Sequence, residues 1–273
     1  MAEFERGRES LVADDRRSPA AATIGAAPEA AQRKDGGAAD GGGRWANERY
    51  PDYEREVRRS IDFVGVGHDF FTRGKAERLI EIAARLGLGA PGARLLDVGC
   101  GVGLLHPWLA PARFSITGVD VAADALIEAR RRQPTIDYQA YDGERLPFAE
   151  ASFDLATAIC VLHHVPPRRW PHFLAEANRV LKPGGALLAF EHNPRNPLTR
   201  LAVSRCEFDR DATLLSAPTL SRLMGETGYV EISREFLFFT PFDNAVARRT
   251  EAWLRRAPIG AQYVAIGRKR RRK

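Results

Sequence analysis

Residues 95–105 read LLDVGCGVGLL, and this stretch decides the fold class. An apolar run leads into a turn that carries Gly99, Gly101 and Gly103. Glycine is needed where a backbone φ must be positive and where a ligand lies directly against the main chain. An apolar strand followed by such a turn is typical of α/β folds that bind nucleotides. We therefore expect a ligand over this turn.

The spacing of the glycines indicates which kind of ligand. The dinucleotide fingerprint is G-x-G-x-x-G, whereas this turn reads G-x-G-x-G and has Leu104 where the third glycine would stand. Asp97 precedes the first glycine by two residues. A carboxylate there would repel a pyrophosphate, but it would attract a ligand that carries an ammonium and a sulfonium group. An NAD-dependent oxidoreductase is therefore disfavoured.

Composition divides the chain, which is long enough for one large α/β domain or two small ones. Residues 1–44 are rich in alanine, glycine and charge, and they hold few large apolar side chains. We expect a disordered tail there, without the apolar segment of a signal peptide. We expect residues 45–92 to form N-terminal helices that act as a lid, and residues 93–267 to form the main domain. Residues 268–273, RKRRRK, are a basic tail.

The net charge of +6 lies in that tail, because the rest of the chain is formally neutral. A neutral body with a basic tail supports polyanion binding only weakly. Cys100, Cys160 and Cys206 are odd in number and far apart, which argues against a disulfide framework and a structural zinc site. No apolar run reaches the roughly 18 residues of a membrane span. We expect a reduced, cytoplasmic protein that binds no metal.

Apolar strands and amphipathic helices alternate along the chain with short connections. Such alternation predicts a parallel sheet with helices on both faces and a ligand site at the carboxyl ends of the strands. Strands are expected at 93–98, 114–120, 136–142, 153–162, 186–192, 229–239 and 261–268. Helices are expected at 50–61, 68–87, 104–109, 122–133, 170–181, 220–227 and 244–256, with a turn at the KPGG of residues 182–185 and a polar insertion after residue 193.

Five segments in this order resemble the class I S-adenosylmethionine-dependent methyltransferases, in particular the broad "type 11" group that acts on small molecules. They read LLDVGCGVG at 95–103, ITGVDVAADAL at 116–126, AYDGERLPF at 140–148, FDLATAICVLHHV at 153–165 and RVLKPGGALLAFEH at 179–192. The resemblance implies a Rossmann-like, doubly wound, three-layer αβα fold. Its seven-stranded sheet would be mostly parallel with an antiparallel C-terminal strand, and residues 93–267 would be the methyltransferase domain.

The resemblance also implies S-adenosylmethionine as cofactor. Asp120 would accept hydrogen bonds from both ribose hydroxyls, Asp142 would take the adenine amino group, and the backbone of Gly143 would meet the adenine ring. Separately, Asp120 could instead cap the helix that follows it, and Asp142 could sit in an Asp-Gly turn. The remaining expected cofactor residues are Asp97, Gly99, Cys100, Gly101, Gly103, Val121 and Ile159.

Methyl transfer is an in-line displacement, so catalysis consists mostly of alignment and, for a hydroxyl acceptor, of proton removal. Histidine suits the role of base because its ordinary pKa lies near neutrality. His163 and His164 follow the fourth expected strand, and Glu191 and His192 end the fifth. His192 is favoured because a polar, proline-punctuated loop follows it, whereas a histidine of LHHV could simply cap or pack the next turn.

The acceptor is less defined. Arg200, Arg205 and Arg210 suit an anionic or polyhydroxylated acceptor, and the basic tail could contact anionic lipid headgroups. These features favour O-methylation of a small molecule, glycan or lipid precursor. A nucleic-acid methyltransferase is less favoured, because ICVLHHVPP at 159–167 lacks the N/D-P-P-aromatic motif that holds a flipped base. A cofactor-binding protein without transferase activity is a further alternative.

Overall fold

The computed structural model describes residue 65 and residues 67–109 and 112–271, which belong to one compact unit, Ala39–Lys273. The expected tail at 1–44 and the expected helix at 50–61 lie outside the described residues, as do the last two residues of the basic tail. No helix within the described ranges is long and apolar enough to cross a membrane.

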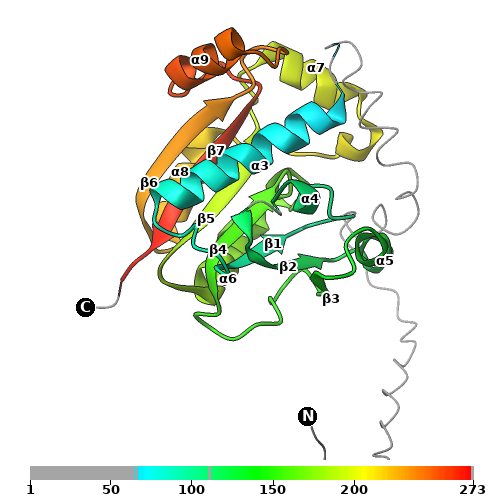
Figure 1. Cartoon of the computed structure of the whole chain (residues 1–273), viewed down its shortest axis with the longest axis vertical. Helices are drawn as coiled ribbons and strands as arrows, with labels where there is room; N and C mark the ends of the chain where they lie inside the picture. Colours follow the sequence, from blue (N-terminus) through cyan, green and yellow to red (C-terminus); the bar gives the residue numbers. More distant parts are fainter. Residues whose placement is uncertain (1–64, 66, 110–111, 272–273) are drawn as a thin grey trace, which may run out of the picture. The chain divides into compact units, whose positions relative to one another are not determined.

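The described unit is built on a seven-stranded sheet with the order β3-β2-β1-β4-β5-β7-β6 (Figure 1). Neighbouring strands are parallel from β3 to β5, whereas β7 runs antiparallel to both β5 and β6. This confirms the predicted doubly wound, mostly parallel sheet with an antiparallel C-terminal strand. The strands are β1 (Arg94–Val98), β2 (Ser115–Asp120), β3 (Asp137–Ala140), β4 (Phe153–Ile159), β5 (Leu181–His192), β6 (Tyr229–Leu237) and β7 (Gln262–Lys269).

Alternate residues of the central strands pack into two separate apolar cores, one on each face of the sheet. Leu96 and Leu187 pack with the buried stripe of helix α6 (Trp170–Val180) and with α8 (Ala217–Glu226). Their strand neighbours Leu95 and Leu188 pack with helix α3 (His68–Arg85) and with α4 (His106–Leu109). Helix α5 (Ala123–Arg132) packs against β2 and β3. These helices form the outer layers of the predicted three-layer fold.

Two connections differ from the sequence-based expectation. The KPGG segment does not separate a helix from a strand: β5 begins at Leu181, directly after α6, and the register against β4 shifts between Phe153 and Leu155. The segment expected as a polar insertion contains helix α7 (Pro197–Arg205). Asn196 caps α7 by accepting a hydrogen bond from the backbone N–H of Thr199 at 3.0 Å. A 3₁₀ turn (Glu207–Asp209) follows and returns the chain toward the sheet.

The C-terminal end of the fold also differs. Strand β7 extends to Lys269, so the first two residues of the predicted basic tail belong to the sheet. Arg268 donates hydrogen bonds to the backbone carbonyls of Leu86 and Gly184, at 3.1 and 2.9 Å. The last strand therefore continues two residues past the domain boundary expected at residue 267. The last helix, α9 (Ala245–Leu254), agrees closely with the helix expected at 244–256.

Candidate functional site

A cavity of about 1150 Å³ opens at the carboxyl ends of β1, β2, β3, β4 and β5, where the topology of a doubly wound sheet places ligands. Of the ten residues expected to hold the cofactor, all but Gly103 line it. Three of the four expected catalytic residues, His163, His164 and His192, line it as well, whereas Glu191 does not. The expected cofactor residues that line the cavity are Asp97, Gly99, Cys100, Gly101, Asp120, Val121, Asp142, Gly143 and Ile159.

The glycine turn after β1 has the conformation that its composition predicts. Gly99, Gly101 and Gly103 have φ values of 75°, 52° and 71°. A Cβ on Gly99 would lie 2.5 Å from Cγ2 of Val161, and one on Gly103 would lie 2.7 Å from the hydroxyl oxygen of Tyr138. Gly99 therefore makes room for Val161, and Gly103 makes room for Tyr138. Gly99 and Gly101 also line the cavity, where they expose main chain without a side chain.

Asp97 belongs to a buried polar chain that the sequence did not reveal. One carboxylate oxygen, Oδ2, lies 3.0 Å from Nε2 of His106, and Nδ1 of His106 lies 2.7 Å from the hydroxyl of Tyr138. His106 can donate to Asp97 through Nε2 and accept from Tyr138 at Nδ1. The second oxygen of Asp97, Oδ1, is buried and has no hydrogen-bond partner among the residues that the structure describes. A carboxylate lining a cavity with one unpaired oxygen fits a cationic ligand group.

Asp120, at the end of β2, secures the glycine turn and faces the cavity. Its two oxygens accept hydrogen bonds from the backbone N–H groups of Gly101 and Ala122, at 2.7 and 2.9 Å. Burial raises the pKa of Asp120 above its ordinary value. Asp120 is not the cap of α5, because the N-cap position is Ala122. Each carboxylate oxygen can accept a further bond, so Asp120 can still receive two hydroxyls.

Asp142 lies in an Asp-Gly turn, the alternative that the sequence left open for this residue. Its Oδ1 accepts hydrogen bonds from the backbone N–H groups of Glu144 and Arg145, at 2.8 and 3.0 Å. These bonds hold the pKa of Asp142 below its ordinary value. Gly143 follows with φ 77°, and both residues line the cavity. The turn thus presents a carboxylate and a glycine main chain to the cavity. It follows β3, which lies at the edge of the sheet, whereas the histidines follow or end β4 and β5.

Glu191 organises the exit of β4 from behind the cavity wall. Its Oε1 accepts hydrogen bonds from the backbone N–H groups of Val161 and Leu162, at 3.1 and 2.7 Å. Its Oε2 lies 2.6 Å from Nδ1 of His163. Burial would raise the pKa of Glu191, but the charge and hydrogen bond of His163 hold it below its ordinary value. Glu191 thus positions His163 rather than facing an acceptor.

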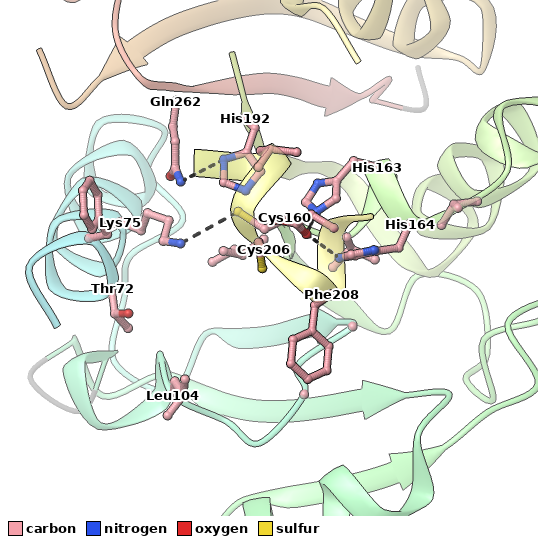
Figure 2. A pocket seen from close by; sticks show the side chains of 18 of the residues that line it. Thr72, Lys75, Leu104, Cys160, His163, His164, His192, Cys206, Phe208 and Gln262 are labelled. Atoms are coloured by element: carbon pink, nitrogen blue, oxygen red, sulfur yellow. Dashed lines mark hydrogen bonds and ion pairs between the residues drawn. The ribbon is translucent and has the colours of Figure 1, made fainter. Parts of the chain in front are cut away.

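His163, His164 and His192 lie close together in the cavity wall (Figure 2). Asp209 lies beside the first two of them, and Glu191 contacts His163. Burial alone would lower the pKa of His163, but Glu191 and Asp209 hold it well above its ordinary value. Desolvation within the cavity and the charge of His163 lower the pKa values of His164 and His192 to about 4. His192 is therefore neutral near pH 7, and Nε2 of Gln262 lies 3.4 Å from its Nδ1.

Asp209 is a site residue that sequence analysis missed, because it lies in the segment read as an insertion. Its Oδ1 lies 3.4 Å from Nε2 of His163 and 3.5 Å from Nε2 of His164. The expected arginines of the same segment behave differently: Arg200, Arg205 and Arg210 are exposed and do not line the cavity. The segment thus brings an acid, and not its arginines, to the site.

The remaining wall of the cavity is rich in aromatic and aliphatic side chains. On the polar side, Lys75 of α3 points toward Cys160, with 3.9 Å between Nζ and Sγ (Figure 2). His68, the first residue of α3, lines the cavity, whereas Asp69 does not. Helix α3 therefore forms a wall of the site. The apolar lining residues include Phe71, Phe173, Leu198, Val203, Phe208, Phe238 and Phe239.

The sheet order, the glycine turn and the two carboxylates at the ends of β1 and β2 define a class of α/β enzymes that bind a nucleoside with a cationic side chain. Comparison with known proteins identifies this chain as similar to methyltransferases. A family model described as "Methyltransferase domain" matches residues 96–189. An uncharacterised methyltransferase of Synechocystis sp. is 31% identical over 149 residues, 53% of this chain and 70% of that protein.

Other relatives match over smaller shares of their length. A demethylmenaquinone methyltransferase of Renibacterium salmoninarum is 35% identical over 50% of this chain and 58% of its own. A ubiquinone biosynthesis O-methyltransferase of Xanthomonas campestris pv. campestris is 36% identical over 48% of this chain and 55% of its own. The chain thus spans little more than half the length of these two relatives.

A solved structure shares the fold. An S-adenosylmethionine-dependent methyltransferase of Thermotoga maritima, described as a possible histamine N-methyltransferase, superimposes with a TM-score of 0.55. It is 24% identical and covers 81% of this chain and 100% of its own. The chain belongs to the class I S-adenosylmethionine-dependent methyltransferases, and S-adenosylmethionine is its cofactor. Oδ1 of Asp97, which is buried without a partner among the described residues, fits the ammonium group of that cofactor. The carboxylate of Asp120, which lines the cavity, fits its ribose hydroxyls.

Proposed function

We propose that the protein methylates a hydroxyl group of an apolar small molecule, such as an aromatic compound or a lipid precursor. The observation that carries the proposal is the composition of the cavity, whose aromatic wall joins the cofactor turn to a cluster of histidines. Such a wall removes apolar surface from water and favours an apolar acceptor over a glycan. Relatives named for ubiquinone O-methylation and for phthiotriol and phenolphthiotriol dimycocerosates support an acceptor of this class.

Different residues of the chain bind the cofactor, bind the acceptor and remove the proton. Bound S-adenosylmethionine supplies a methyl group that is already strongly electrophilic. Asp97, Asp120 and the turn at Asp142 hold the cofactor, and the aromatic wall holds the acceptor and excludes water from the site. His192, which lines the cavity at the end of β5, takes the hydroxyl proton. Gln262 can turn its amide oxygen toward Nδ1 of His192, which then carries the hydrogen and leaves Nε2 to accept the proton.

A nucleic-acid acceptor is less well supported. Arg268 of the expected basic tail is engaged by backbone carbonyls, and Lys269 donates to the carbonyl of Arg179 at 3.1 Å. Contact of the last tail residues with anionic lipid stays a prediction.

The test is a transfer assay with cofactor labelled in its methyl group and a panel of phenols and long-chain alcohols. His192→Gln keeps the size of the side chain and removes the base, so we expect kcat to fall by about 10²- to 10⁴-fold. Binding of S-adenosylhomocysteine should stay within about twofold of wild type, as should both parameters in the control His172→Gln, at an exposed histidine outside the cavity lining. Methylation of amines alone, or full activity in His192→Gln, would contradict the proposal.

A further inference from the structure

We propose that the acceptor half of the cavity binds a divalent transition-metal ion of the zinc type. The ligands are Nε2 of His163, Nε2 of His164 and one carboxylate oxygen of Asp209. These three atoms lie within 4.8 Å of one another, and all three residues line the cavity. The site is distinct from the cofactor turn, and its presence does not depend on the identity of the acceptor.

The separations fit a shared ion better than direct hydrogen bonds. Oδ1 of Asp209 lies 3.4 Å from Nε2 of His163 and 3.5 Å from Nε2 of His164. Strong hydrogen bonds between charged nitrogen and oxygen are shorter, about 2.7 to 2.9 Å. Two ligands bound at about 2.0 to 2.1 Å with a tetrahedral angle between them lie about 3.3 to 3.4 Å apart, as follows from zinc bond lengths. Both distances from Asp209 therefore match those between ligands of one ion, and the two histidine nitrogens lie within 4.8 Å of each other.

The surroundings of His163 are those of a metal-binding histidine. Its other ring nitrogen, Nδ1, lies 2.6 Å from Oε2 of Glu191. A carboxylate in that position fixes the orientation of the ring and directs the lone pair of Nε2 at the ion. Glu191 is itself held by the backbone N–H groups of Val161 and Leu162. Glu191, which is buried and does not line the cavity, therefore orients a metal ligand.

The chain also secures the third ligand. The backbone N–H of Thr213 donates to the carbonyl of His163 at 2.9 Å, which ties the segment after α7 to the exit of β4. The backbone N–H of Asp209 donates to the carbonyl of Cys206 at 3.1 Å, and the N–H of Ala212 donates to the carbonyl of Asp209 at 3.0 Å. The acid is thus presented from an ordered turn. Two histidines and a carboxylate suit zinc or iron(II) rather than magnesium or calcium, which prefer oxygen ligands only.

Three protein ligands leave a position open toward the cavity, as in catalytic rather than structural zinc sites. This role rests on the proposed function. The acceptor hydroxyl takes the open position, and the ion lowers its pKa. The O–H bond then breaks, the oxygen keeps the electron pair, and the proton passes to His192, whose ring centroid lies 5.1 Å from that of His163. The expectation that the protein binds no metal rested on cysteine spacing alone. The three proposed ligands contain no cysteine, and Asp209 is distant in sequence from the two histidines.

The test uses full-length protein without an affinity tag, stripped with a chelator and then titrated with ZnCl₂ and, separately, CoCl₂. Zinc content after dialysis measures stoichiometry, and the visible absorption of bound Co²⁺ reports nitrogen and oxygen ligands in a low-symmetry site. We expect one ion per chain in wild type, and an affinity at least about 100-fold lower in His164→Ala and Asp209→Asn. Glu191→Gln should weaken binding by about 10- to 100-fold, as loss of such supporting carboxylates does elsewhere. The control His172→Ala should bind as wild type does.

Binding of S-adenosylhomocysteine is measured on the same samples and shows which variants retain the folded cofactor site. Loss of metal with retained cofactor binding in His164→Ala or Asp209→Asn supports the site. Wild-type protein that binds S-adenosylhomocysteine but neither Zn²⁺ nor Co²⁺ at micromolar concentration overturns it. Metal binding that is unchanged in both ligand variants also overturns it. If methyl transfer to hydroxyls fails while the metal result holds, the proposed function fails and the metal site stands.

Discussion

Replacing Asp97 by asparagine should change cofactor affinity and protein stability in opposite directions. Oδ2 of Asp97 pairs with His106, whereas Oδ1 is buried without a partner in the described part of the chain. Asparagine keeps the shape and can still accept the bond from His106, but it removes the negative charge. In the free protein the substitution replaces a buried charged oxygen by a neutral amide group, so we expect the melting temperature of Asp97→Asn to equal or exceed that of wild type.

Cofactor binding should move in the opposite direction. A hydrogen bond to a charged group contributes about 1.5 to 3 kcal/mol, so S-adenosylhomocysteine should bind about 10- to 150-fold more weakly to Asp97→Asn by calorimetric titration. 5′-Methylthioadenosine, which lacks the amino-acid portion, should bind equally to both proteins. Asp137→Asn, at an exposed position on β3, is the matched control. Equal weakening for both ligands, or a loss of stability that accounts for the loss of affinity, would refute the role assigned to Asp97.

Two further predictions concern the fold around the site. Gly99→Ala places a Cβ 2.5 Å from Val161 at φ 75°, so chemical denaturation should show a loss of at least about 1 to 2 kcal/mol, and cofactor binding should weaken as well; unchanged stability would contradict the observed turn. Burial would raise the pKa of Asp154, but hydrogen bonds from Lys182 and from the backbone N–H of Arg94 hold it below its ordinary value. Wild type should therefore exceed Asp154→Asn by about 1 kcal/mol in free energy of unfolding at pH 7, and this advantage should disappear as the pH falls below about 4; an advantage that persists in acid would show that the charge is not responsible.

The parallel part of the sheet could be predicted from the sequence because strands and helices alternate along the first half of the fold. β1, β2 and β5 are largely apolar runs that end beside a glycine turn, in an acid or in a histidine, and parallel topology gathers the carboxyl ends of β1 to β5 at one edge. The cavity-lining residues Asp97 and Asp120 could be singled out for the same reason, since each lies at or near the end of a strand; their cofactor roles stay predictions. The strand at Leu181 was harder to place because Pro183 and the glycines after it read as a turn.

The residues that sequence analysis missed depend on contacts between distant segments. His106 and Tyr138 pair across α4 and β3, and nothing in the sequence around either residue indicates the other. Asp209 reaches His163 only because α7 and the turn after it fold back over the cavity. Likewise, Glu191 lay next to His192 in the motif, but alternation along β5 directs the two side chains to different surroundings. Spacing alone carries no such information.

The most direct test of the central claim, that the glycine turn after β1 holds S-adenosylmethionine, is calorimetric titration of the protein with S-adenosylhomocysteine and with NADH. We expect micromolar binding of the first and none of the second. In Asp120→Ala, loss of a charged acceptor for two ribose hydroxyls should weaken S-adenosylhomocysteine by about 100-fold or more. Binding of NADH, or binding of S-adenosylhomocysteine that Asp120→Ala leaves unchanged, would contradict the account.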